Sequence, residues 1–68
     1  MKTISGKRLC KILSDKGWTR LRIKGSHHAY ESLDGETHVS VPVHGNGDLQ
    51  RGMLHRLMKD AGLTEADL

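Results

Sequence analysis

Residues 26–43, "SHHAYESLDGETHVSVPV", decide the fold of this chain. In the second half, "THVSVPV", valines alternate with other residues, which predicts a strand with one buried face. Asp34 and Gly35 predict a two-residue hairpin turn before it, because both residue types tolerate a positive φ. That turn places Tyr30 opposite Val39, and both side chains suit a buried face. The stretch is therefore predicted to form two antiparallel strands.

The same register assigns opposite directions to the two adjacent histidines of this stretch. Neighbouring residues on a strand face opposite sides of the sheet, and His28 falls opposite Val41 on the buried side. We therefore expect His28 to point toward the interior and His27 to point outward. A slip of the strands by one residue would exchange the two imidazoles, but the valine pattern argues against it.

A further strand is predicted just before this stretch, over "WTRLRIK", residues 18–24. Strict alternation along it gives two sets of side chains, the inward Thr19, Leu21 and Ile23 and the outward Arg20, Arg22 and Lys24. A hairpin turn at Gly25-Ser26 would place Ile23 opposite His28. This pairing agrees with the register deduced from the valines.

Helices are predicted on both sides of the strands, at about residues 5–16 and 48–61. Ser5 and Asp48 are placed to cap their N-termini, and a glycine suited to a left-handed conformation follows each helix. Each helix has an apolar stripe at helical spacing, so both should pack on the sheet. The methionines of the second stripe are expected in the core.

The order helix, three strands, helix indicates an α+β fold. An antiparallel meander needs only short hairpins, so both helices should cover one face of the sheet and leave the other open. Pro42 cannot donate a ladder hydrogen bond, which predicts that the last strand lies at an edge. Thr64 and Asp67 match a capping box for one last short turn. We expect a single domain over residues 1–68, because a chain of this length supports one small core.

Composition favours a soluble protein that meets a polyanion. The net charge of +3 in a chain of 68 residues favours nucleic acid before membrane as a partner, although many small soluble proteins are basic. The single cysteine, Cys10, cannot form an internal disulfide, which fits a reducing cytosol. The N-terminus has no apolar run suited to a signal peptide or a membrane span. We therefore expect a cytoplasmic protein.

The predicted outward face offers residues that metal-independent RNA cleavage needs. Such cleavage needs a base near the 2′-hydroxyl, an acid for the leaving oxygen and positive charge near the phosphate. A histidine performs either proton transfer near neutral pH, and His27 is the outward one. Arg20, Arg22 and Lys24 are candidates to hold the phosphates. Taken by themselves, these residues fit a solvated basic strand with a turn histidine better than they fit catalysis.

Further polar candidates lie in turns and on surfaces. Gly25 would let an RNA backbone approach closely, and Ser26 could donate a hydrogen bond to it. His44, at the end of the last strand, could contact RNA or anchor the following loop. His38 is expected to pair across the strands with Glu31. No metal or other cofactor is expected, because the sequence has neither C-x-x-C nor H-x-x-x-H spacing.

The chain resembles the HicA family of bacterial toxins, also called YcfA-type, which are mRNA interferases. The resemblance lies in "KGSHHAY" at 24–30, "DG" at 34–35, "VPVHG" at 41–45 and "GMLHRLMKDAGLT" at 52–64. It covers nearly all of the chain and implies the α-β-β-β-α fold of a double-stranded-RNA-binding domain. It also implies a metal-independent endoribonuclease, which a HicB antitoxin neutralises by covering the catalytic histidine.

The Gly-Ser-His motif of that family falls on Gly25, Ser26 and His27, so the resemblance implies His27 as the catalytic residue. Some members have the active histidine one place later, which makes His28 the second choice. We expect a toxin that acts on mRNA, monomeric alone and hetero-oligomeric with its antitoxin. Two alternatives remain, an RNA-binding module of the same fold without chemistry and a protein-interaction domain whose open face docks a partner.

Overall fold

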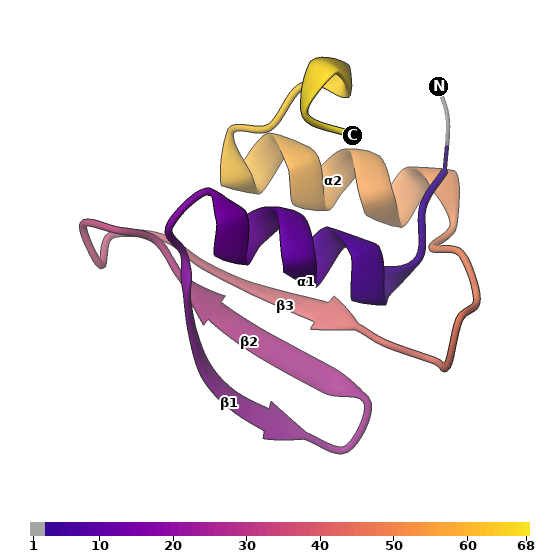
Figure 1. Cartoon of the computed structure of the whole chain (residues 1–68), viewed down its shortest axis with the longest axis horizontal. Coiled ribbons are helices and arrows are strands. Elements are labelled where there is room, and N and C mark those ends of the chain that lie inside the picture. Colours follow the sequence, from indigo (N-terminus) through magenta and orange to yellow (C-terminus); the bar gives the residue numbers. More distant parts are fainter. Residues whose placement is uncertain (1–2) are drawn as a thin grey trace.

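The structure is a computed structural model that describes residues 3–68. Its elements are α1 (Gly6–Asp15), β1 (Thr19–Lys24), β2 (His27–Glu31), β3 (His38–Pro42), α2 (Arg51–Ala61) and a final 3₁₀ turn, η1 (Glu65–Asp67). The strands form an antiparallel sheet in the order β1-β2-β3, and both helices lie on the same side of it (Figure 1). The α+β fold with an open sheet is confirmed, and Pro42 lies in an edge strand as predicted.

Local sequence signals fix three helix ends as predicted. The Ser5 hydroxyl accepts a hydrogen bond from the Arg8 amide at 3.0 Å and so caps α1. Gly17 follows the last turn of α1 with φ of 93°, and Gly62 ends α2 with φ of 70°. Both angles lie in the left-handed region that glycine enters without steric penalty.

The C-terminal turn is fastened to its own start and to α1. The capping box of η1 is present, and the Asp67 carboxylate accepts a hydrogen bond from the Thr64 amide at 2.8 Å. The same carboxylate lies 2.6 Å from Lys16 Nζ, just after α1. The contact with Lys16 is the main reason that the pKa of Asp67 falls below 3.8. This short turn therefore has charged as well as backbone contacts.

Each face of the sheet consists of rows of residues paired across the strands. The helix side has Arg20–Tyr30–Val39 and Ile23–His28–Val41, and the open face has Thr19–Glu31–His38, Arg22–Ala29–Ser40 and Lys24–His27–Pro42. Tyr30, Val39 and Val41 are buried in one core with residues of both helices. The predicted register is confirmed, and with it the inward direction of His28 and the outward direction of His27.

The prediction of strict alternation along β1 is wrong, because a β-bulge interrupts this strand at Leu21. Arg20 pairs with Tyr30, but Arg22 pairs with Ala29, the adjacent residue of β2, so Leu21 is the extra residue. Side chains alternate between the two faces of the sheet with period two. One extra residue therefore places the side chains on one side of the bulge on the face opposite to the one that strict alternation predicts.

The bulge moves two predicted side chains to the opposite face. Arg20 lies on the helix side instead of the open face, and Thr19 lies on the open face instead of the helix side. The predicted burial of Leu21 and Ile23 is also wrong, since both side chains are 49% exposed. The reason is that α2 packs mainly against β3, while β1 packs on the helix side mainly against α1, so this edge of the sheet is thinly covered.

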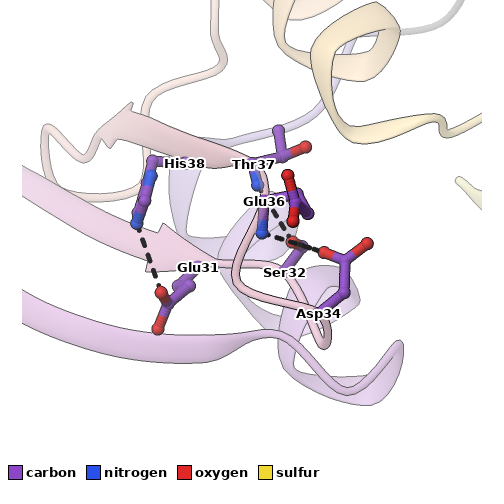
Figure 2. A network of polar contacts seen from close by, with 6 residues as sticks. All are labelled: Glu31, Ser32, Asp34, Glu36, Thr37 and His38. Carbon is purple, nitrogen blue, oxygen red and sulfur yellow. Dashed lines mark hydrogen bonds and ion pairs between the residues drawn. The ribbon is translucent and has the colours of Figure 1, made fainter.

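The connection between β2 and β3 is wider than the predicted two-residue turn. The Ser32 amide donates to the Thr37 carbonyl at 2.9 Å, and inside this pair the Gly35 amide donates to the Ser32 carbonyl at 3.0 Å, with φ of 74° at Gly35. The Asp34 carboxylate accepts hydrogen bonds from the Ser32 hydroxyl at 2.6 Å and the Glu36 amide at 3.0 Å (Figure 2). The bond from Ser32 is the main cause of a lowered pKa at Asp34. The side chain thus closes a wider loop without changing the register.

The second helix begins later than predicted, and Asp48 does not cap it. Gln50 occupies the N-cap position instead. Asp48 pairs with Ser5 in an antiparallel bridge, and the Leu49 amide donates to the Ile4 carbonyl at 2.8 Å. This pairing with the segment before α1 overrides the capping preference of the aspartate.

Candidate active site

A cleft of about 610 Å³ opens at the end of β3, between the open face of the sheet and the start of α2. We call it the β3 cleft, and its lining residues are His27, Ser40, Pro42, His44, Asp48, Leu49, Gln50 and Met53. One wall is therefore the sheet, and the other is the segment that pairs with the residues before α1. The fold brings three separate parts of the chain together here.

The two adjacent histidines have different surroundings. His27 is exposed, lines the β3 cleft and lies between Lys24 and Pro42 in its row. His28 is half-buried on the helix side, beside the fully buried Val41. A polyanion that approaches the open face therefore meets the imidazole of His27.

Two of the three predicted cations accompany His27 on the open face. Lys24 pairs directly with His27, and Arg22 lies in the neighbouring row. Arg20 lies on the other side of the sheet, where its charge acts on Cys10 and Tyr30. The positive charge at the site therefore comes from Arg22 and Lys24.

The turn between β1 and β2 leaves its backbone accessible. Gly25 has φ of 58° at the first of two turn residues, as a type II′ hairpin turn requires. Among the described residues other than Gly25 and its two chain neighbours, no heavy atom lies within 4 Å of the position that a Cβ of Gly25 would occupy. The Ser26 carbonyl accepts a hydrogen bond from the Val43 amide at 2.6 Å, so β3 stays joined to this turn beyond Pro42.

Four further titratable side chains do not line the β3 cleft, those of His38, His55, Cys10 and Tyr30. His38 Nε2 lies 3.3 Å from Glu31 Oε1, which confirms their predicted pairing (Figure 2). His55 is exposed on α2 and is not among the residues that line the β3 cleft. Burial is the main cause that raises the pKa of the Cys10 thiol and of the Tyr30 phenol. Both groups are therefore protonated, and unsuited to act as nucleophiles, at neutral pH.

The wall of the β3 cleft formed by residues 48–53 is not predicted from the sequence. Met53, predicted to lie in the core, is 42% exposed and lines the cleft. Asp48 is predicted to cap the helix and Leu49 to belong to its apolar stripe. Leu49 is buried in the core as expected, but both residues lie before α2 and line the cleft. The sequence signal at these positions indicates only an amphipathic helix, because their pairing with Ile4 and Ser5 is a long-range contact.

Two kinds of feature are absent from the described part of the chain. Residues 3–68 contain no group of three or more histidine, cysteine, aspartate or glutamate side chains that could hold a metal ion. Within the same range, neither helix has the length and apolar character needed to cross a membrane.

Comparison with known protein families agrees with this fold. A family model described as "HicA toxin of bacterial toxin-antitoxin" matches residues 6–63, from the start of α1 to beyond α2. The chain belongs to the HicA toxin family. As a HicA-family member it is a toxin of a bacterial toxin–antitoxin system, and it has an antitoxin as its partner. A search of curated proteins gave no match. The range matched by the HicA model includes every residue that lines the β3 cleft.

Proposed function

We propose that this HicA-family toxin is a metal-independent endoribonuclease that cleaves mRNA, with His27 as its catalytic histidine. The observation that carries the proposal is the position of His27, which is exposed at the β3 cleft and paired with Lys24. His28, the second choice, is half-buried on the helix side, where an RNA strand has poorer access.

The chemistry follows from the groups on the open face. His27 moves a proton as the RNA 2′-hydroxyl attacks the adjacent phosphorus, a task that suits an imidazole near neutral pH. Lys24 and Arg22 hold the phosphate and stabilise the negative charge that grows on it. The expected products are a 2′,3′-cyclic phosphate or 3′-phosphate end and a 5′-hydroxyl end.

The turn and the end of β3 supply further contacts with RNA. Gly25 lets the RNA backbone approach, since the space beside it is open, and Ser26 donates a hydrogen bond. His44, just past the end of β3, contacts the RNA within the same cleft. The substrate is a single strand, because its unpaired backbone can bend into a concave site.

Three matched histidine-to-alanine variants test this proposal. His27→Ala should lose most of the cleavage rate and keep its melting temperature, since an exposed side chain leaves no cavity. His28→Ala should mainly lower the melting temperature, because it borders the core. His55→Ala is the control for removing an exposed imidazole, and it should match the unaltered protein in both assays. Cleavage of RNA and thermal melting are measured for each variant, with cleavage expected to persist in excess EDTA.

The outcomes separate the proposal from its alternatives. A folded but inactive His28→Ala beside an active His27→Ala would move the catalytic role to His28. An RNA-binding module without chemistry predicts that the purified protein binds RNA and leaves it intact. In that case His27→Ala would still inhibit growth when it is expressed, whereas the nuclease proposal requires the inhibition to disappear.

The antitoxin is proposed to cover the open face around His27 with an acidic surface. Arg22 and Lys24 attract such a surface, and covering His27 is enough to keep RNA out. The toxin would then be a monomer alone and part of a hetero-oligomer when inhibited. Association rates measured across salt concentrations test this idea. The rate should fall as salt rises, and a rate indifferent to salt would show that these charges do not steer binding.

A further inference from the structure

The β3 cleft contains a second histidine that the proposed reaction has not yet used for chemistry. We infer that His44 is the general acid that protonates the leaving 5′-oxygen while His27 acts as the base. This inference rests on the proposed ribonuclease function and deepens it. It requires that His44 reach the far side of a phosphate that His27 approaches from the near side.

The pairing of β2 with β3 places the two histidines at a suitable separation. His27 is directly opposite Pro42, and the bond between Val43 and Ser26 carries the pairing one residue further. His44 follows Pro42 by two residues, just past the end of β3, and it lines the β3 cleft together with His27, so the spacing of diagonal neighbours sets the scale of their separation. Diagonal neighbours on one face are about 7–8 Å apart, within reach of aromatic side chains.

That separation fits one phosphodiester between two imidazoles. A proton donor or acceptor must come within about 2.6–3.2 Å of the oxygen that it serves. The attacking and leaving oxygens lie roughly in line on opposite sides of the phosphorus. His27 in β2 and His44 just past β3 both line the cleft, so each imidazole can reach one of these oxygens. Both side chains are exposed, so both can turn toward a bound strand.

The chemistry of the cleft leaves His44 as the best candidate for the acid. The titratable residues among those lining the β3 cleft are His27, His44 and Asp48. Proton transfer near neutral pH is a role that imidazole side chains commonly perform. The Asp48 carboxylate already accepts a hydrogen bond from the Thr3 hydroxyl at 3.3 Å. His44 is therefore the residue assigned as the acid.

The proposed step balances without a metal or redox partner. His27 takes the proton of the 2′-hydroxyl as the 2′-oxygen forms its bond to phosphorus. The bond from phosphorus to the 5′-oxygen breaks, and its electron pair takes the proton of the His44 imidazolium. The products are a 2′,3′-cyclic phosphate and a 5′-hydroxyl. Water then returns a proton to His44 and removes one from His27, which restores both groups.

A change of leaving group tests the assignment. The substrate is a short RNA whose cleavage site has been mapped with the unaltered protein, made once with the normal 5′-oxygen and once with sulfur in its place. A thiolate leaves without being protonated, so it needs no general acid. His44→Ala should cleave the normal RNA about 10²–10⁴-fold more slowly than the unaltered protein and recover nearly all of that loss on the sulfur RNA. His27→Ala should be slow on both substrates, and His55→Ala should be unchanged on both.

The outcomes distinguish this assignment from the proposed function itself. Equal losses for His44→Ala on the two substrates mean that His44 only binds RNA, and an unaffected rate on the normal RNA means that it has no role. Either result overturns the assignment while leaving the nuclease in place. A His27→Ala variant that cleaves like the unaltered protein would instead overturn the proposed catalytic role of His27.

Discussion

Replacing Gly6 with alanine should destabilise the fold, although alanine is the better helix former. Gly6 is the first residue of α1, and it is buried against the end of β3. A Cβ at this position would run into the Pro42 carbonyl oxygen and lie 3.1 Å from its carbon and 3.3 Å from Val43 Cα. These are backbone atoms that cannot rotate away, so α1 would have to move off β3.

The net effect follows from two opposing contributions. Forcing extra volume into a packed site costs about 1–3 kcal/mol, and alanine in place of glycine returns at most about 1 kcal/mol of helix propensity. A chain of 68 residues has a total stability of about 3–10 kcal/mol. The overlap with backbone atoms places the cost at the upper end of its range, so a net loss of about 2 kcal/mol should lower the melting temperature by about 8–16 °C.

Gly52 provides a control with the same chemical change. It lies in the first turn of α2 and is exposed. Apart from its chain neighbours and the nearby backbone of α2, no heavy atom of the described residues lies within 4 Å of the place that an alanine methyl would take. Gly52→Ala should therefore raise the melting temperature by a few degrees, up to about 8 °C. Both variants are compared by thermal melting followed with far-ultraviolet circular dichroism. A Gly6→Ala protein that melts at or above the unaltered protein would refute the close approach of α1 to β3.

Three further predictions concern stability and reactivity. Asp67→Asn should lower the melting temperature near neutral pH but hardly in strong acid. The lowered pKa of Asp67 contributes stability above pH 3.8, and this stability is lost as the pH falls through the lowered pKa. A difference in melting temperature that does not depend on pH would contradict this. Cys10 is 7% exposed with a raised pKa, so a colorimetric thiol reagent should modify it far more slowly in the folded protein than in urea, and equal rates would disprove its burial. In urea unfolding, the free energy of unfolding should fall by about 2–5 kcal/mol for Leu54→Ala, because Leu54 is fully buried, and by less than about 1 kcal/mol for Ile23→Ala. Similar losses would mean that β1 is better covered than the structure indicates.

The parts of the fold that could be predicted from sequence depend on local signals that agree with one another. Tyr30, Val39 and Val41 all suit the buried face of β2 and β3, and a slip by one residue would move these side chains away from one another's face. Ser5 and Gly62 meet their expected helix ends because each depends on a local feature, the Ser5 side chain that accepts from the Arg8 amide and the left-handed backbone of Gly62. The inward and outward directions of the two histidines follow from the same register.

The parts that could not be predicted depend on contacts between distant residues. In "TRLRIK" the alternation is perfect, so only the pairing with β2 shows that Leu21 is extra and that Arg20 faces the helices. Asp48 has a strong preference for capping, and only its bridge to Ser5 shows why it does not cap α2. Consequently the sequence assigns Arg20 to the open face, although it lies on the helix side. It also does not predict that residues 48–53 form one wall of the β3 cleft.

The bridge between Ser5 and Asp48 also bears on how the protein is made. It joins residues near the start of the chain to residues just before the last helix, and Thr3 and Asp48 are 45 positions apart. A ribosome adds about 5–20 residues each second from the N-terminus, so the residues of the three strands are made up to about 2 s before Met53 completes the second wall of the cleft. A nascent or truncated chain that stops before Asp48 has the residues of all three strands but lacks that wall. The cleft can therefore form only after residues 48–53 have been made.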